Sequence, residues 1–378
     1  MNQESLAPLS APVADSEKHI GLLAPFRYRN FTFLYIGQLV SSLGDQAYAI
    51  ALPWTVLAVT GDARAMSAVL VAAYVPRTLL LLVGGALADR LSPRAIMLFA
   101  DIARTLVVGA MGLLLFGSHI PLWLVAVLAA MQGAASGLFS PCYVSITPTI
   151  LPSELLAGGN GMIMVMNFAT MIVGPIFGGI ATAAQATAAF LGDAGTFAVS
   201  ALSLAAMRVP RPQREHITPR QHLIREIGEG FRYALHDPLI RATMIMTIFG
   251  NIGLAGVLDV GLIVLSRNLS PSPVTLGVLF AAFGIGGIVG GLGAGPLARL
   301  RRRGPIVLIG WIINAVLLAL IPFFAGSAGR LPLALAIPAS WQFPIIIALL
   351  FVVGIFLSLG DTLILTLFQQ NIEQHVMS

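Results

Sequence analysis

The feature that most constrains this chain is a series of long apolar blocks that are almost free of charged residues. An α-helix needs about 20 residues, at about 1.5 Å each, to cross roughly 30 Å of hydrocarbon. The blocks have that length, and 57% of the residues are hydrophobic while only 10% are charged. A water-soluble fold has too little interior to bury so much apolar chain. We therefore expect an all-α integral membrane protein.

Hydropathy predicts about ten spanning helices. They are placed at 31–59, 67–88, 95–116, 121–143, 159–183, 187–207, 242–265, 274–298, 305–325 and 343–368. The longest polar stretch, 208–241, separates the first six from the last four. We therefore predict an N-terminal tail at 1–25, a six-helix bundle at 26–207, a linker at 208–241 and a four-helix bundle at 242–378.

The basic residues predict the orientation of these helices. If the N-terminus is cytoplasmic, most of the 21 Lys and Arg residues lie on the inner side, and only Arg64, Arg267 and Arg330 lie outside. This asymmetry follows the positive-inside rule. We expect a multi-pass protein of the plasma membrane, in bacteria the inner membrane, with a cytoplasmic N-terminus, a cytoplasmic tail and a cytoplasmic linker. Because orientation accounts for the basic clusters, no nucleic-acid partner is expected.

Several kinds of chemistry find no support in the sequence. Cys142 is the only cysteine, and no Cys/His cluster suggests a metal site. There is no Gly-x-x-x-x-Gly-Lys-Ser/Thr segment for ATP, and no nucleophile set for a membrane-embedded enzyme. We expect no catalytic residues, no cofactor and no resident metal.

An internal repeat indicates two related halves. Residues 69–74, Val-Leu-Val-Ala-Ala-Tyr, recur at 278–283 as Val-Leu-Phe-Ala-Ala-Phe, and Gly-Ala-Leu-Ala at 85–88 recurs as Gly-Pro-Leu-Ala at 295–298. Chance similarity between helices rich in Ala, Leu and Gly is the alternative explanation. Parallel repeats of this kind are typical of transporters whose substrate site lies between the halves.

Short motifs carry a family resemblance. Gly85-Ala-Leu-Ala-Asp89-Arg90-Leu-Ser-Pro-Arg94, after the second span, resembles the loop signature Gly-x-x-x-Asp-Arg-x-Gly-Arg of the major facilitator superfamily. Gly174-Pro175-Ile-Phe-Gly178-Gly179, in the fifth span, is similar to that family's antiporter signature. Glycines allow close helix packing, and proline bends the helix.

Other segments resemble one branch of that superfamily. The segments Phe26 to Phe31, Gly44-Asp45-Gln46 and Phe190 to Ala194 are similar to the macrolide-efflux and enterobactin-exporter branch. The resemblance implies a two-bundle transporter with twelve helices. It also favours export of a substrate in exchange for protons.

Two departures from the family pattern stand out. The family often has an arginine three residues before Gln-Gly in the fourth helix, where this chain has Ala129. The coupling mechanism associated with that arginine therefore does not transfer directly. The chain also reaches Ser378 just after the tenth predicted span, so we expect a C-terminal bundle that lacks two of its six helices and a longer reading frame that would supply them.

Charged residues inside the bilayer are the main site candidates, since each costs at least about 2.5–3.5 kcal/mol to insert and must be paired or functional. They are Asp45, Arg77, Asp101, Arg104, Asp193, Asp259 and Asp361. Asp45 and Arg77 come to similar depths, so we predict Asp45 as the proton-responsive group and Arg77 as its partner in one transport state. A permanent salt bridge between them is the structural alternative.

The other candidates have plain structural alternatives. Asp101 and Arg104 are spaced for a local pair on one helix face, and Asp193 could be a packing group near the interface. Asp361 lies near the cytoplasmic end, as a gate or loop contact would. Four more residues could line a substrate cavity or pack in the bundle: Trp54, Met164, Asn167 and Asn314.

We therefore predict a secondary transporter in the lipid bilayer that exports an amphipathic small molecule, such as a drug, a macrolide-like compound or a siderophore-like compound. Alternating access with proton antiport is the expected mechanism. A truncated, non-transporting membrane protein or scaffold is the alternative.

Overall fold

The computed structural model describes residues 23–115, 121–208, 253–270, 272–297, 303–324 and 338–371, with scattered positions between 232 and 250. Helices make up nearly all of these residues, and no strand occurs among them. The elements are η1 (Ala24–Arg27), α1 (Arg29–Thr60), α2 (Ala63–Arg90), α3 (Pro93–Leu114), α4 (Leu122–Ile150), α5 (Ser153–Ala184), α6 (Ala186–Ala206), η2 (Gly256–Gly261), α9 (Leu262–Leu269), α10 (Pro273–Leu297), α11 (Arg303–Phe324) and α12 (Ala339–Asn371). Almost all of the expected tail and linker falls outside the described residues.

Eight of the described helices are long and apolar enough to cross a membrane. Helices suit a bilayer because they satisfy every internal backbone N–H and C=O without water. The turns are short: Gly61 adopts φ 65° after α1, and the Asp62 side chain accepts a hydrogen bond from the Arg64 N–H at 2.8 Å at the start of α2. The expectation of an all-α, multi-pass membrane protein is confirmed.

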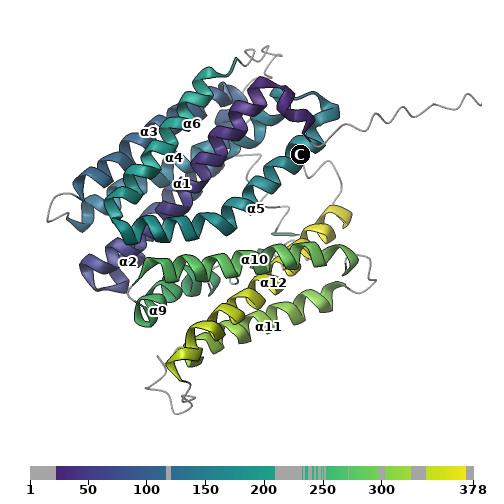
Figure 1. The fold of residues 1–378 in the computed structure, drawn as a ribbon. Coiled ribbons are helices and arrows are strands. Elements are labelled where there is room, and N and C mark those ends of the chain that lie inside the picture. Colours follow the sequence, from purple (N-terminus) through teal and green to yellow (C-terminus); the bar gives the residue numbers. More distant parts are fainter. Residues whose placement is uncertain are drawn as a thin grey trace, which may run out of the picture.

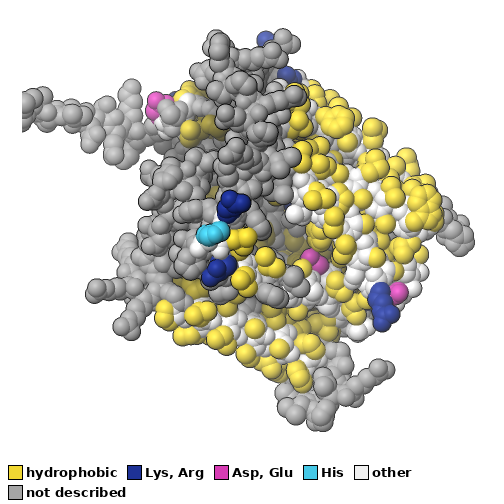
Figure 2. Space-filling model, turned by 180° about the vertical axis from the view of Figure 1, so that it is seen from behind, with side chains coloured by type: hydrophobic (Ala, Val, Ile, Leu, Met, Phe, Trp, Pro, Cys, Tyr) yellow, Lys and Arg dark blue, Asp and Glu magenta, His cyan; other side chains and the backbone are white. Residues whose placement is uncertain are grey.

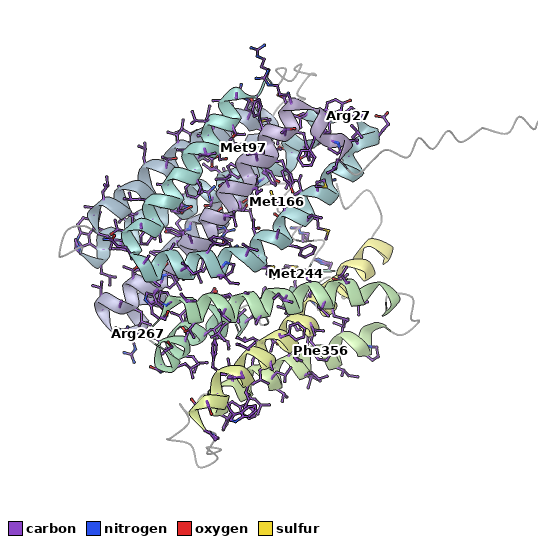
Figure 3. All side chains as sticks on the ribbon, in the orientation of Figure 1. Arg27, Met97, Met166, Met244, Arg267 and Phe356 are labelled. Atoms are coloured by element: carbon purple, nitrogen blue, oxygen red, sulfur yellow. The ribbon has the colours of Figure 1, made fainter. Side chains whose placement is uncertain are left out.

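The helices lie in two groups (Figure 1). Helices α1 to α6 pack on one another in the first group, and α9 to α12 do so in the second. Helices α5 and α10 lie side by side at the boundary and make the main contact between the groups. Arg27 and Arg267 mark opposite ends of the molecule (Figure 3). We call these the Arg29 end, where α1 begins, and the Thr60 end, where α1 finishes.

Glycines set the closest helix contacts in both groups, and they do so at repeated positions. A Cβ on Gly133 of α4 would collide with the carbonyl oxygen of Ala73 on α2, and one on Gly354 of α12 would collide with that of Phe283 on α10. Phe283 lies 210 residues after Ala73, which equals the offset between the repeated segments 85–88 and 295–298 and exceeds by one the offset between 69–74 and 278–283. The second and fourth helices of each half thus pack alike, which favours a true internal repeat over chance similarity.

Hydrophobic side chains cover most of the described surface in the view of Figure 2, and charged side chains are few. Among the described residues, Leu106, Leu202 and Leu292 have 68%, 71% and 77% of their surface exposed. An apolar exterior of this extent suits contact with lipid chains rather than water.

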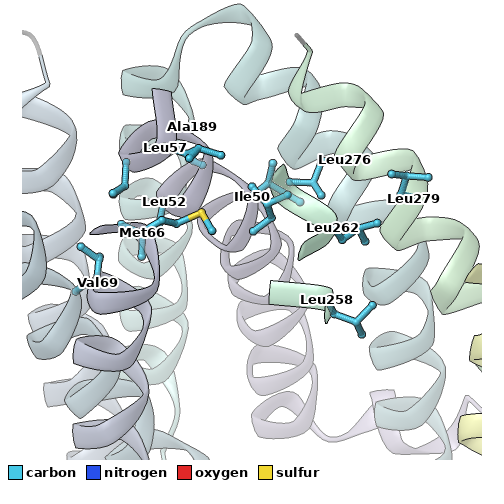
Figure 4. Packing of buried hydrophobic residues seen from close by; sticks show 14 of the residues in the cluster. Ile50, Leu52, Leu57, Met66, Val69, Ala189, Leu258, Leu262, Leu276 and Leu279 are labelled. Atoms are coloured by element: carbon cyan, nitrogen blue, oxygen red, sulfur yellow. The ribbon is translucent and has the colours of Figure 1, made fainter. Parts of the chain in front are cut away.

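Apolar packing joins the two groups at the Thr60 end. Leu52 and Leu57 of α1 belong to the same buried cluster as Leu262 of α9 and Leu276 of α10 (Figure 4). A second buried cluster lies toward the Arg29 end, around Phe31. Its members among the described residues all come from the first group of helices. The two groups are therefore held together chiefly at the Thr60 end.

Candidate functional site

A cavity of about 580 Å³ lies between the two groups of helices. Its wall is formed mainly by α1, α2, α4 and α5, and η2, α9 and α10 close the opposite side. Polar and apolar groups are mixed along it, as a site for an amphipathic ligand requires. Candidate residues from the sequence that line it are Asp45, Arg77, Arg104, Asn167, Pro175 and Asp259.

A charged cluster lies inside the first group of helices, at the edge of the cavity. The Arg104 guanidinium on α3 makes an ion pair with the Asp45 carboxylate on α1 and a longer one, at 3.4 Å, with Asp101. The Arg104 side chain is only 3% exposed, whereas that of Asp45 is 37% exposed and borders the cavity. The Arg104 guanidinium also lies 3.8 Å from the centre of the Phe197 ring. The cation is thus fixed by two carboxylates and an aromatic face.

The expected pairing of Asp45 with Arg77 does not occur in this conformation. Arg104 occupies the position beside Asp45, and no ion pair of Arg77 is found among the described residues. The prediction compared depths along each helix but not the directions in which the side chains point. Arg77 is instead exposed on the cavity wall.

Asp259 brings the second group of helices into the site. It lies in η2, a short π-helical segment, and borders the cavity. Tyr74 on α2 lines the same cavity and lies close enough to Asp259 for the two side chains to interact electrostatically. Single π-helical turns inside longer helices occur frequently at functional sites. Tyr74 and Asp259 therefore form a polar contact between the two groups at the cavity.

The Gly-Pro motif of α5 is wedged between α1 and α10. A Cβ on Gly174 would collide with the Gln46 side chain, and one on Gly178 would come within 2.8 Å of the Ala47 Cα on α1. Gly179 faces the second group instead, where a Cβ would lie 2.7 Å from the carbonyl oxygen of Pro273 on α10. The predicted motif thus touches both groups of helices.

The loop motif after α2 is only partly described. The side chains of Asp89 and Arg90 lie outside the described residues, and a Cβ on Gly85 would meet nothing within 4 Å. Arg94 donates from Nε to the Leu204 carbonyl at 2.7 Å and from Nη2 to the Ala205 carbonyl at 2.8 Å. It thereby caps the C-terminal end of α6, where a cation is favoured.

Four other candidates lie away from the cavity. Trp54 packs on the apolar cluster of the Thr60 end, and Met164 is 58% exposed on α5. Asn314 is buried in α11, and its side-chain amide oxygen, Oδ1, accepts no hydrogen bond from the described residues. Asp361 is exposed on α12. None of these four is among the residues that line the cavity.

Sequence reasoning did not place Asp193 beside Asp45. Asp193 lies only a few residues from the start of α6, which suggested a position near the membrane interface. However, a Cβ on Gly44, next to Asp45, would collide with the Asp193 carboxylate. Helix α1 extends well beyond the start of the shorter α6, so distance from a helix end was a poor measure of depth. The two Gly-Asp pairs, at 44–45 and 192–193, were the signal that could have suggested their proximity.

Two curated exporters are similar to this chain in sequence. The multidrug efflux pump Tap of Mycolicibacterium fortuitum is 28% identical over 296 residues, covering 75% of this chain and 71% of Tap. The enterobactin exporter EntS of Escherichia coli is 28% identical over 272 residues, covering 66% of this chain and 63% of EntS. The chain therefore spans less than two thirds of the length of EntS.

Solved transporter structures share the fold. The nucleoside transporter NupG matches with a TM-score of 0.70 at 10% identity, covering 92% of this chain and 84% of that one. A bacterial homologue of the human lysosomal transporter Spinster matches with a TM-score of 0.62 at 15% identity, covering 89% of this chain and 75% of that one. The sequence model of the Major Facilitator Superfamily matches residues 34–378 of this chain. The chain belongs to the Major Facilitator Superfamily.

Proposed function

We propose that this protein is a secondary transporter that exports an amphipathic small molecule by alternating access, in exchange for protons. The observation that carries the proposal is the cavity of about 580 Å³ between the two groups of helices, with packed apolar side chains joining the groups at the Thr60 end. A cavity closed at one end is what one state of an alternating-access cycle requires. The sequence relatives Tap and EntS, an efflux pump and an exporter, support the direction.

The distribution of charge supports a cytoplasmic N-terminus. Arg27, Arg29 and Arg94 lie at the Arg29 end, whereas Arg64 and Arg267 lie at the Thr60 end. With the positive side inside, the sealed end faces outward. The cavity would then be loaded from the cytoplasm or the inner leaflet.

The lining supports an amphipathic substrate that carries an anionic or strongly hydrogen-bond-accepting group. Phe139, Ile263 and Phe280 supply apolar surface. Arg77 supplies an exposed guanidinium that has no ion-pair partner among the described residues. A guanidinium in a partly desolvated wall binds carboxylate-like or phenolate-like oxygens well, because it can donate two parallel hydrogen bonds.

The Asp45–Arg104 pair supports coupling to protons. Asp45 and Arg104 both border the cavity, but only the Asp45 side chain is substantially exposed there, so a proton or a substrate can reach its carboxylate. Protonation of Asp45 would remove one of the two carboxylates that hold Arg104. Because Asp101 remains beside Arg104 at 3.4 Å, the cation would stay paired while its position changes. Proton binding could thereby bias the arrangement of α1 against α3.

Asp45→Asn tests this proposal, with Asp361→Asn as its control. The Asn variant mimics the protonated form, and Asp101 still pairs with Arg104, so we expect folded protein. Proton-driven export should fall at least about tenfold, which corresponds to about 1.4 kcal/mol, while exchange of substrate without a gradient persists. Asp361→Asn removes a carboxylate outside the cavity and should export normally. Normal export by Asp45→Asn with an unchanged pH dependence would contradict the proposed coupling.

A further inference from the structure

Three carboxyl groups lie near one guanidinium inside the first group of helices, but only two of them pair with it. Arg104 is paired with Asp45 and Asp101, and Asp193 lies against the backbone beside Asp45. Asp101 is fully buried and Asp193 is 1% exposed. With every carboxyl ionised, the cluster would carry a net charge of two negative units, and two of its three carboxylates, Asp101 and Asp193, would be buried away from water.

Asp193 is the member that lacks a counter-charge. Its Oδ1 accepts a hydrogen bond from the Thr196 hydroxyl at 3.2 Å. Its Oδ2 is buried and has no hydrogen-bond partner. No cation lies within ion-pair distance of Asp193 in the described part of the chain. An ionised carboxylate with one free oxygen in such a place is strongly unfavourable, since burial of an unpaired charge costs far more than burial of a neutral acid.

Two charged groups act on Asp193, one of each sign: Asp45 of α1 is negative and Arg104 of α3 is positive. The nearby Tyr48 hydroxyl of α1 is uncharged, and the remaining carboxylate, Asp101, pairs with Arg104. The only charged residue of α5, Glu154, lies in its first turn, at the Arg29 end. The single positive charge of Arg104 is already shared between two carboxylates. Asp193 therefore needs a positive charge of its own.

A proton fits this need better than a metal ion. No three His, Cys, Asp or Glu side chains converge as a metal site within the described residues. The fixed Arg104 guanidinium would also repel a second cation in the cluster. A proton needs only one free oxygen, which Asp193 Oδ2 supplies.

We propose that Asp193 is a proton-binding site, with the proton held on its carboxyl group in the conformation described here. The neutral acid keeps its hydrogen bond from Thr196 and removes one negative charge from the cluster. Its role in the transport cycle rests on the export function proposed above. A proton taken from water would be released when α1 moves away from α6 at Gly44, since that movement admits water to the carboxyl group.

The proton itself can be measured without substrate or flux. Infrared difference spectra of the purified full chain in lipid, taken between high and low pH, should contain the C=O stretch of a buried carboxylic acid. The band should disappear in Asp193→Asn and should change frequency in Asp193→Glu. It should persist in Asp45→Asn. If Asp193→Asn does not fold, the frequency change in Asp193→Glu still identifies the group.

Three results would overturn the proposal. One is a carboxylic acid band that is unchanged in both Asp193 variants. Another is the absence of such a band in the wild type. The third is loss of the band when Na⁺ or Mg²⁺ is added at constant pH, which would identify a cation site instead. These spectra do not depend on whether the export proposal is correct. Gradient-driven export by Asp193→Asn tests separately whether the proton takes part in transport. If the band is confirmed but this variant exports normally, the proton has a purely structural role.

Discussion

Gly179 should control the contact that seals the cavity. An added Cβ at this position would lie 2.7 Å from the Pro273 carbonyl oxygen and 2.9 Å from the Val274 Cα. Both are backbone atoms of α10, so the clash cannot be relieved by rotating a side chain. Gly179→Ala should therefore push α5 and α10 apart at the Thr60 end.

The size of the effect follows from the cost of overpacking, about 1–3 kcal/mol. If that cost applies only to the sealed state, the population open at the Thr60 end should rise roughly 5- to 150-fold. Gly178→Ala provides the contrast, because its Cβ would lie 2.8 Å from the Ala47 Cα within the first group. That variant should lower thermal stability without favouring the open state.

Thiol labelling can measure this opening. Ser266 is fully buried in α9 near the sealed end, so Ser266→Cys in a Cys142→Ser background places one near-isosteric reporter there. We expect labelling to be faster with Gly179→Ala. Gly161→Ala on the same helix, where a Cβ meets nothing within 4 Å, should label as slowly as the parent. Equal labelling of folded Gly179→Ala and its parent would refute the reasoning.

Three further outcomes are expected. Arg77→Gln should weaken the binding of anionic substrates more than that of neutral ones, measured as separate affinities, and an equal loss for both would exclude Arg77 from recognition. Arg267 donates a hydrogen bond to the Leu57 carbonyl at 2.5 Å, so Arg267→Gln should enlarge the population that is open at the Thr60 end. Distances between spin labels at Val59 and Asn268 measure that population, and an unchanged distance distribution would show that this hydrogen bond does not hold the end closed. Gly354→Leu should prevent folding, because its side chain would overlap the Phe283 carbonyl, whereas Gly293→Leu should remain folded, because a Cβ at Gly293 meets nothing within 4 Å. Size-exclusion chromatography distinguishes the two, and a monodisperse Gly354→Leu protein would contradict the close packing of α10 and α12.

The fold was largely predictable because its determinants are local. Each spanning helix follows from an apolar block, and the repeat at 69–74 and 278–283 predicted related second helices. The helix ends were less predictable. Helix α4 continues to Ile150 although its predicted span ended at 143, because a helix can extend past the hydrocarbon while its backbone remains hydrogen-bonded.

The arrangement of the site depended on information that hydropathy does not carry. Asp45, Arg104 and Asp193 lie on three different helices, and their meeting depends on the rotation and relative length of α1, α3 and α6. Asp101 and Arg104 were predictable as a pair because they lie three residues apart on one helix. The pairing of Arg104 with Asp45, fifty-nine residues away, was not.

The most direct test of the central claim uses the purified chain in vesicles with an imposed pH gradient and a fluorescent amphipathic anion. If the protein exchanges protons for substrate, the gradient should drive accumulation of the anion against its concentration, and added substrate should dissipate the gradient. Asp45→Asn should abolish both effects while leaving passive exchange intact. Equal substrate distribution with and without the gradient, in vesicles whose protein binds the anion, would contradict proton-coupled transport.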